Sequence, residues 1–302
     1  MGRRNGESHE DYESLRARAR EAVTRGHLDE ALALCDRAIA WAEKHGDKES
    51  QDQEYCNLSG ILIAQGRGDD VISKLRQILL SSSKPAICYH AAYNISRYHE
   101  MRRQNERGMF YARICLDHAK RTEQPEPVAR SYNQLGLLLV RDSYFEDAGS
   151  YFTKALGVLP IEPSHDRTIT LSNLGCCQVM LGDLKPGFSH LFQSLRLLKR
   201  QSAEIWEMYP RLGLSYAYLD AGRPDRACVH ARRGLFLAEQ AEIVWQVKNA
   251  LYLLGESEKL SGNELAAHRT FTRLQEEFYP DDPVIPDFLM ATDVRKLINF
   301  MA

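Results

Sequence analysis

The sequence lacks the features that would mark a membrane-spanning or secreted chain. No apolar run approaches the roughly 18 residues that a membrane-crossing helix needs, and the polar residues 1–10 contain no apolar core of a signal peptide. The 7 cysteines are odd in number and scattered, with no Cys-x2-Cys pair, which is typical of a reducing compartment. We therefore predict a cytoplasmic protein.

A strong excess of charge of either sign is also missing. Lys plus Arg number 39 and Asp plus Glu number 41, which gives a net charge of -2. Non-specific attraction to nucleic acid or to a membrane surface needs a basic excess. The composition therefore predicts neither direct nucleic-acid binding nor membrane binding, and 44% hydrophobic residues indicate an ordinary folded protein.

Sequence motifs of catalysis are absent as well. The chain has no Walker loop, no Gly-x-Ser-x-Gly elbow, no His-Glu-x2-His pair and no dinucleotide fingerprint. Its 10 histidines are dispersed, without a second ligand at helical spacing beside a carboxylate. We predict no catalytic residue, no cofactor and no metal ion.

A repeated packing pattern is present instead, and it is clearest between residues 132 and 160. It combines aromatic, Leu-Gly, small and proline positions at fixed offsets: Tyr132, Leu135, Gly136, Leu139, Ala148, Phe152 and Pro160. Gly136 and Ala148 are small where the two helices of one hairpin are expected to cross. The pattern resembles the tetratricopeptide (TPR) repeat, whose hairpins stack because one hairpin cannot bury its own apolar face.

The pattern recurs along the chain at a period near 40 residues. The small residue that opens each second helix stands at Ala31, Val71, Gly108, Ala148, Gly187, Ala227 and Ala267. Twelve residues before each of these anchors lies another small residue: Ala19, Ser59, Ser96, Gly136, Gly175, Ser215 and Gly255. Five residues before the anchor, glycine is usual, which fits a helix-ending turn with positive φ.

Spacing and resemblance together predict an all-α fold, a right-handed TPR superhelical solenoid of seven helix-turn-helix repeats with a C-terminal capping helix. A flexible leader would occupy residues 1–9, and the TPR array residues 10–280. We expect its units at about 10–46, 48–83, 85–123, 125–160, 164–201, 203–241 and 243–280. Residues 281–302 would form a linker and the capping helix, with the helix itself at about 287–301.

The resemblance implies that the first helix of each repeat lines a concave groove. At one position of this helix, four consecutive repeats carry an amide side chain: Asn57, Asn94, Gln134 and Asn173. An amide both donates and accepts, so such a ladder can hold the backbone of an extended peptide. Similar ladders occur in kinesin light chains, in spindle-orientation adaptors with Leu-Gly-Asn repeats and in quorum-sensing peptide receptors of Gram-positive bacteria. The alternative is that these amides bridge neighbouring helices.

Arginines and tyrosines add further candidate contacts to the same face. Arg97, Arg130 and Arg141 make its middle basic, and Tyr209 and Tyr216 lie toward its C-terminal end. We expect a ligand with an acidic group or free carboxylate near its centre, which arginine can bind through two hydrogen bonds. The alternative is that the arginines pair with acidic residues of adjacent helices.

The sequence thus predicts a protein- or peptide-binding adaptor or scaffold with an unidentified partner. One alternative is a bacterial regulatory peptide sensor, similar to the quorum-sensing receptors, that acts on a separate effector chain. A third possibility is an enzyme subunit that uses groove residues such as His90, Cys176 or Glu256. It is the weakest of the three, because no nucleophile, base and orienting group fall together at motif spacing.

Overall fold

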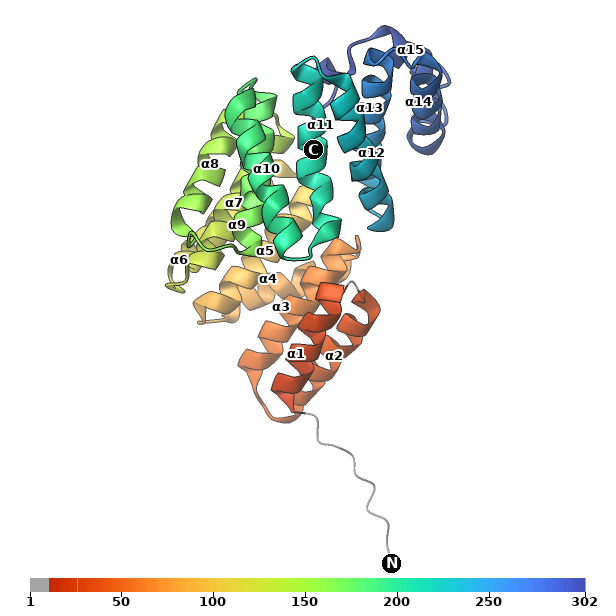
Figure 1. Cartoon of the computed structure of the whole chain (residues 1–302). Helices are drawn as coiled ribbons and strands as arrows, with labels where there is room; N and C mark the ends of the chain where they lie inside the picture. The colour runs from red at the N-terminus through yellow and green to blue at the C-terminus, as the bar shows by residue number, and fades with distance from the viewer. Residues whose placement is uncertain (1–10, 26, 302) are drawn as a thin grey trace, which may run out of the picture. The chain divides into compact units, whose positions relative to one another are not determined.

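The computed structural model describes residues 11–25 and 27–301, and all regular structure in that part of the chain is helical. The contacts between helices divide the chain into two compact units. The first unit ends at Gln134 and the second begins at Leu135, so the division falls within α7 (Pro125–Arg141). In each unit the helices follow one another as hairpins (Figure 1). The prediction of an all-α fold is confirmed.

The first unit consists of six complete helices and the first part of α7. Its helices are α1 (Tyr12–Arg25), α2 (Leu28–Lys44), α3 (Lys48–Ala64), α4 (Ile72–Ser81), α5 (Pro85–Met101) and α6 (Asn105–Lys120), with a 3-10 turn, η1 (Gly68–Asp70), before α4. The larger core cluster of this unit includes Leu15, Leu34, Leu58, Leu75 and Ile95, and a smaller one joins Tyr89 and Ala92 on α5 to Cys115 and Ala119 on α6.

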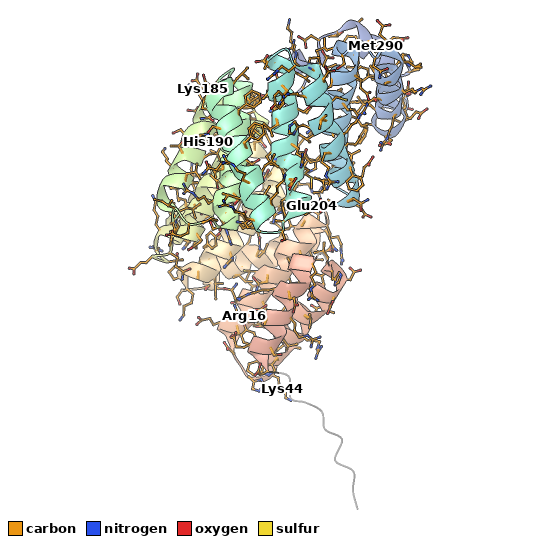
Figure 2. The ribbon with its side chains drawn as sticks, in the orientation of Figure 1. Arg16, Lys44, Lys185, His190, Glu204 and Met290 are labelled. Atoms are coloured by element: carbon orange, nitrogen blue, oxygen red, sulfur yellow. The ribbon has the colours of Figure 1, made fainter. Side chains whose placement is uncertain are left out.

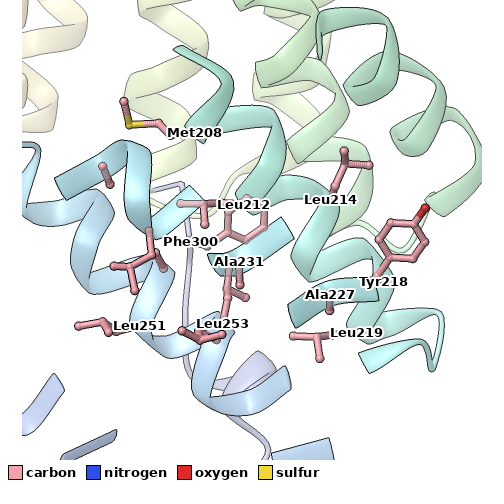
Figure 3. Close-up of a cluster of buried hydrophobic side chains, with 14 of the residues drawn as sticks. Met208, Leu212, Leu214, Tyr218, Leu219, Ala227, Ala231, Leu251, Leu253 and Phe300 are labelled. Carbon is pink, nitrogen blue, oxygen red and sulfur yellow. The ribbon is translucent and has the colours of Figure 1, made fainter. Parts of the chain in front are cut away.

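The second unit contains the end of α7 and all the helices that follow. These are α8 (Phe145–Val158), α9 (His165–Met180), α10 (Leu184–Arg200), α11 (Met208–Asp220), α12 (Pro224–Gln240), α13 (Val244–Leu260), α14 (Glu264–Phe278) and α15 (Ile285–Ala291). Two 3-10 turns, η2 (Glu204–Glu207) and η3 (Val294–Lys296), precede α11 and follow α15. The largest core cluster of this unit is built around α11 to α14, and Phe300 from the end of the chain belongs to it (Figure 3).

Local sequence signals explain where several helices begin. Asp47 caps α3 by accepting a hydrogen bond from the backbone N–H of Ser50, and Ser164 caps α9 in the same way. Proline stands at the start of α5, α7 and α12, where its missing N–H has no intrahelical partner to lose.

The small residues of the repeat lie where the two helices of a hairpin cross. Ser96 Oγ on α5 donates to the carbonyl oxygen of Gly108 on α6 at 2.9 Å. Ser215 Oγ on α11 donates in the same way to Ala227 on α12 at 3.0 Å. Each bond joins an anchor residue to the residue twelve positions before it, so the register taken from the sequence holds at both hairpins.

Positive φ angles mark the turn inside each hairpin, as the glycine pattern indicates. Five residues before the anchors, φ is 79° at Gly66, 82° at Gly182, 67° at Gly222 and 79° at Gly262. Arg103 and Ser143 occupy the same position with φ of 55° and 62°, although neither is glycine. The turn geometry is therefore kept even where the sequence supplies a residue that disfavours it. Gly26, the first member of the series, lies outside the described residues.

The capping helix is present but shorter than predicted. α15 packs on α14, with Pro286 and Leu289 buried, and it ends at Ala291. Thr292 is extended, with φ −119° and ψ 150°, and the Asp293 side chain accepts from the backbone N–H of Arg295 to start η3. Asp competes with helical hydrogen bonds in this way, which explains why the helix does not run on to residue 301. Residues 292–301 are called the C-terminal segment.

Candidate functional site

The odd-numbered helices carry every residue that the sequence predicts to bind a ligand. Within the first unit α3 contacts α5, and within the second α9 contacts α11 and α11 contacts α13. We call the side of these helices that bears the predicted residues the odd-helix surface of each unit. Its predicted members are Asn57 on α3, Asn94 and Arg97 on α5, Arg130, Gln134 and Arg141 on α7, Asn173 on α9, and Tyr209 and Tyr216 on α11.

Two of the four predicted amides join neighbouring helices. Asn94 Nδ2 on α5 donates to the carbonyl oxygen of Cys56 on α3 at 2.7 Å. Gln134 Nε2 on α7 donates to Glu100 Oε2 on α5, also at 2.7 Å. Both side chains are buried, at 7% and 2% exposure, and buried amides are normally held by such internal partners. These two residues therefore match the helix-bridging alternative, since their donors are used within the first unit.

The third amide belongs to a buried carboxylate site. Glu54 on α3 is 1% exposed, forms an ion pair with Arg16 Nε at 2.8 Å and accepts from Tyr12 Oη at 3.0 Å. Asn57 Nδ2, one turn further along α3, also donates to Glu54, at 3.0 Å. Arg16, labelled in Figure 2, thus compensates a charge that burial alone would make costly. Burial, with the negative charge of Glu54 adding to it, raises the pKa of Tyr12 to about 12.

Positive charge gathers near His90 on α5. Burial, together with the positive charges of Arg130 and Arg16, lowers the pKa of His90 to about 4. The half-buried Arg97 lies two turns further along α5, and its guanidinium forms no hydrogen bond or ion pair with residues 11–25 or 27–301. Burial is the larger cause of the lowered pKa of His90, and the guanidinium groups of Arg130 and Arg16 add to it.

The predicted tyrosine Tyr209 is part of an aromatic row at the start of α11 and α13. Its ring stacks on Trp206 at 6.0 Å and lies 6.1 Å from the ring of Trp245. Both tryptophans are partly exposed, at 38% and 42%. Asn173 and Arg141, the remaining predicted residues, are half-buried and already take part in contacts within the chain.

The odd-helix surface of the second unit is occupied by the C-terminal segment. Tyr216 Oη on α11 donates to the backbone carbonyl oxygen of Arg295 at 3.2 Å. Asn249 Nδ2 on α13 donates to the backbone carbonyl oxygen of Phe300 at 3.0 Å. The Phe300 ring lies 5.1 Å from the Tyr216 ring and is 3% exposed. Two successive first helices therefore hold one irregular segment by its backbone, which is the chemistry that the amide ladder predicts.

Lys259 anchors the start of this segment from the other end of α13. Its Nζ donates to the carbonyl oxygens of Leu289 at 2.9 Å and Thr292 at 2.5 Å. It also pairs with Glu256 at 2.6 Å, and Glu256 is 1% exposed. A buried carboxylate thus fixes the ammonium group that holds the end of α15.

Two of the residues considered for an enzyme subunit, Cys176 and Glu256, are held by burial and by pairing. Cys176 is buried in the apolar cluster of the second unit, and burial raises the pKa of its thiol far above the ordinary value, which leaves it unreactive. The Glu256 carboxylate forms an ion pair with Lys259. Within the described residues, no three His, Cys, Asp or Glu side chains lie where they could hold a metal ion. The same part of the chain contains no helix long and apolar enough to cross a membrane.

Among the side chains that hold the C-terminal segment, the sequence places Tyr216, Asn249 and Glu256 on this surface, but it misses Lys259. Asn249, Glu256 and Lys259 follow one another at offsets of seven and three, which places them on one face of α13. That spacing is visible in the sequence. The segment's own partners, Arg295 and Asn299, are missed because the sequence predicts a helix there.

Comparison with known proteins gives structural likeness without sequence likeness. No protein-family model matches the chain, and the search of curated proteins found no match either. A Rap protein complexed with competence and sporulation factor superposes with a TM-score of 0.69 at 11% identity, covering 88% of this chain and 77% of that one. Aspartyl phosphate phosphatase F of Bacillus subtilis gives a TM-score of 0.65 at 14% identity, covering 89% of this chain and 70% of that one.

A third solved structure is described as a TPR protein. It comes from Parabacteroides merdae and superposes with a TM-score of 0.53 at 17% identity, covering 94% of this chain and 98% of that one. At these identities the likeness concerns the fold. The chain has the fold of a TPR-like helical solenoid.

Proposed function

We propose that this chain is a protein- or peptide-binding module that holds an extended segment on its odd-helix surface. The observation that carries the proposal is the pair of side-chain donors, Tyr216 and Asn249, bonded to backbone carbonyl oxygens of an irregular segment. Backbone capture by donors on successive helices gives affinity that is independent of sequence, and neighbouring side chains then give specificity.

The first unit supplies a basic part of the proposed site. Arg97 on α5 and Arg130 on α7 supply two guanidinium groups in this unit, which can bind a carboxylate of the ligand. We assign ligand contact there to Arg97, Arg130 and Asn57. Asn94 and Gln134 act on the ligand indirectly, by holding the helices at their spacing. In the second unit the proposed contacts are Arg141, Asn173, Tyr209 and Tyr216.

A regulatory sensor is the second candidate, and the occupied surface of the second unit favours it. A Rap protein of similar fold is known in complex with competence and sporulation factor. By analogy, ligand binding would change the arrangement of this chain and be transmitted to a separate effector chain. Neither candidate assigns a catalytic step to this chain. The free cysteines support action in a reducing compartment such as the cytoplasm.

The test is selection of peptides from a displayed library of random 12-residue sequences against the purified full chain. Selected peptides are then titrated against Arg97→Glu/Arg130→Glu. The matched control is Arg113→Glu, because Arg113 is an exposed arginine of the same unit on the even-numbered helix α6. We expect acidic peptides to lose at least about tenfold in affinity with the double variant, equal to 1.4 kcal/mol, and to be unaffected by the control. The proposal fails if no peptide is enriched, or if both variants bind as the unmodified chain does.

A further inference from the structure

The C-terminal segment is held mainly by side chains of the helices beneath it, with little regular structure of its own. After η3, residues 297–301 form no helix. Val294 and Phe300 are buried at 0% and 3% exposure, while Leu297 between them is 49% exposed. Two apolar side chains thus enter the core of the second unit while the backbone that joins them remains at its surface.

The polar contacts of the segment extend over several first helices. In addition to the bonds from Tyr216 and Asn249, the segment reaches the end of α7, where Asn299 Nδ2 donates to the carbonyl oxygen of Val140 at 2.7 Å. Asn299 also donates to Ser143 Oγ at 3.3 Å. The segment therefore contacts α13, α11 and the end of α7 through its polar groups.

Charge complements these contacts at the other end of the segment. Arg295 lies 3.5 Å from a carboxylate oxygen of Asp220 and donates to the carbonyl oxygen of Leu219 at 3.3 Å, both at the end of α11. The hydrogen bonds that the Arg295 guanidinium donates to Asp293, and the further charges of Asp220 and Glu256, raise the pKa of this guanidinium. Asp220 thus supplies one carboxylate of α11 to Arg295, in addition to Asp293 of the segment itself.

The Phe300 side chain fills a place formed by the helices of the second unit. It belongs to the same cluster as Leu212, Ala231 and Leu253, and Figure 3 shows it among these residues. Its ring also lies against Tyr216. An aromatic side chain of an external segment could fill the same place with equal burial.

We propose that the C-terminal segment is an intramolecular occupant of a peptide-binding site on the odd-helix surface of the second unit. The external ligand that displaces it is an extended segment with the same pattern, an arginine followed five residues later by an aromatic residue. This inference rests on the proposed function and deepens it, because it names the ligand class of one surface and the means of its regulation.

The physical basis is competition between a tethered and a free ligand. A short tether gives the resident segment an effective concentration in the millimolar range, on the order of that found for short linkers. A free segment with equal intrinsic affinity therefore binds weakly until the resident is released. The apparent dissociation constant of the free segment equals its intrinsic dissociation constant divided by the fraction of chains in which the resident segment is released.

The experiment measures binding of a fluorescently labelled peptide with the sequence of residues 292–302 to the full-length chain. Phe300→Asp removes the buried ring and places a charge in an apolar site, so the resident segment is released while the surface keeps its own residues. We expect the labelled peptide to bind this variant at least about tenfold more tightly than the unmodified chain. Adding Asn249→Ala to the released variant should weaken binding of the peptide again.

Leu297→Asp is the matched control. It introduces the same charge into the same segment, but at a side chain that is 49% exposed, so it should leave peptide binding as in the unmodified chain. The proposal is overturned if the unmodified chain and Phe300→Asp bind the peptide equally well, or if neither binds it. Circular dichroism of each variant reports whether the helices remain folded.

A second measurement requires no variant. Hydrogen exchange of the backbone amides at 297–301 should proceed by local release, faster than exchange in α11 and insensitive to mild denaturant. Exchange of the two regions at one common rate would mean that the segment leaves only on global unfolding, and would overturn the proposal even if Phe300→Asp fails to fold. Local release without any selected peptide would instead support the occupant and refute the proposed function. Library peptides that bind equally well to the unmodified chain and to the released variant would support the proposed function and overturn the proposal that the C-terminal segment occupies the binding site.

Discussion

Asn249 on α13 donates a hydrogen bond from Nδ2 to the backbone carbonyl oxygen of Phe300, 51 residues further along the chain, at 3.0 Å. Both groups are buried. Removing the donor leaves the carbonyl oxygen without that partner, so Asn249→Ala should lower the free energy of unfolding by about 1–3 kcal/mol. Urea titration followed by circular dichroism measures this change.

Asn263→Ala is the comparison for that variant. Asn263 precedes α14 in the same unit, is exposed and makes no capping hydrogen bond with its side chain. Its replacement should change stability by less than about 0.5 kcal/mol. Equal effects of the two substitutions would show that the bond to Phe300 contributes nothing.

Gly136 tests the repeat register within the second unit. A Cβ atom at this position would lie 2.5 Å from Phe152 Cε1, closer than any real contact. Gly136→Leu should therefore destabilise the fold by at least about 3 kcal/mol, since the hairpin of α7 and α8 must separate. The measurement is the urea midpoint or the melting temperature.

Gly157→Leu, on α8 of the same hairpin, provides the contrast. A Cβ there has no atom within 4 Å, and glycine in a helix is less stable than leucine. This substitution should stabilise the chain by about 0.5–1 kcal/mol. Destabilisation by both variants to the same extent would contradict the crossing of α7 and α8 at Gly136.

Arg103 occupies a turn position where glycine is favoured. Its φ of 55° is left-handed, a conformation that costs about 1–2 kcal/mol for a residue with a Cβ atom. Arg103→Gly should raise the free energy of unfolding by about 0.5–1 kcal/mol, because part of that gain is offset by the greater entropy of glycine in the unfolded chain. The reverse exchange, Gly222→Arg at φ 67°, should lower it. If both exchanges leave the melting temperature unchanged, the turn geometry is not retained in solution.

The parts of the fold that could be predicted from the sequence are those set by local packing. Ser215 and Ala227 are twelve residues apart and meet directly, so their small size is readable as a pattern. The path of the C-terminal segment depends on different physics. The side-chain amide of Asn299 donates a hydrogen bond to the carbonyl oxygen of Val140, 159 residues away. No periodicity in the sequence predicts such a bond.

The contacts of the predicted site residues could be foreseen only in part from the sequence. The amide ladder lies on odd-numbered helices, but Asn94 and Gln134 donate to Cys56 and Glu100 on the neighbouring helices. Whether an amide faces a ligand or the next helix depends on the spacing between helices, which a single sequence does not specify. Asn249 performs backbone capture although it lies two hairpins beyond the last amide of the ladder at Asn173.

His230 on α12 gives the stability of the chain a pH dependence of definite sign. Its ring stacks on Tyr218 at 5.5 Å, and burial together with the charges of Arg211 and Arg226 lowers its pKa to about 4. In the unfolded chain the pKa of histidine is about 6.5. Between these two pH values the unfolded state binds more protons than the folded state. The contribution of His230 to the free energy of unfolding is therefore fully present above about pH 6.5 and is lost as the pH falls toward 4.

The variant His230→Phe keeps the stacked ring and removes the titrating group. At pH 4.5 it should retain on the order of 2 kcal/mol of stability that the unmodified chain loses relative to pH 7. His268→Gln, at an exposed histidine of the same unit, serves as the control and should leave the pH profile unchanged. Denaturant titrations at pH 7 and pH 4.5 decide between the outcomes. A loss of stability on acidification that is as large in His230→Phe as in the unmodified chain would mean that His230 is not the neutral, buried group described above.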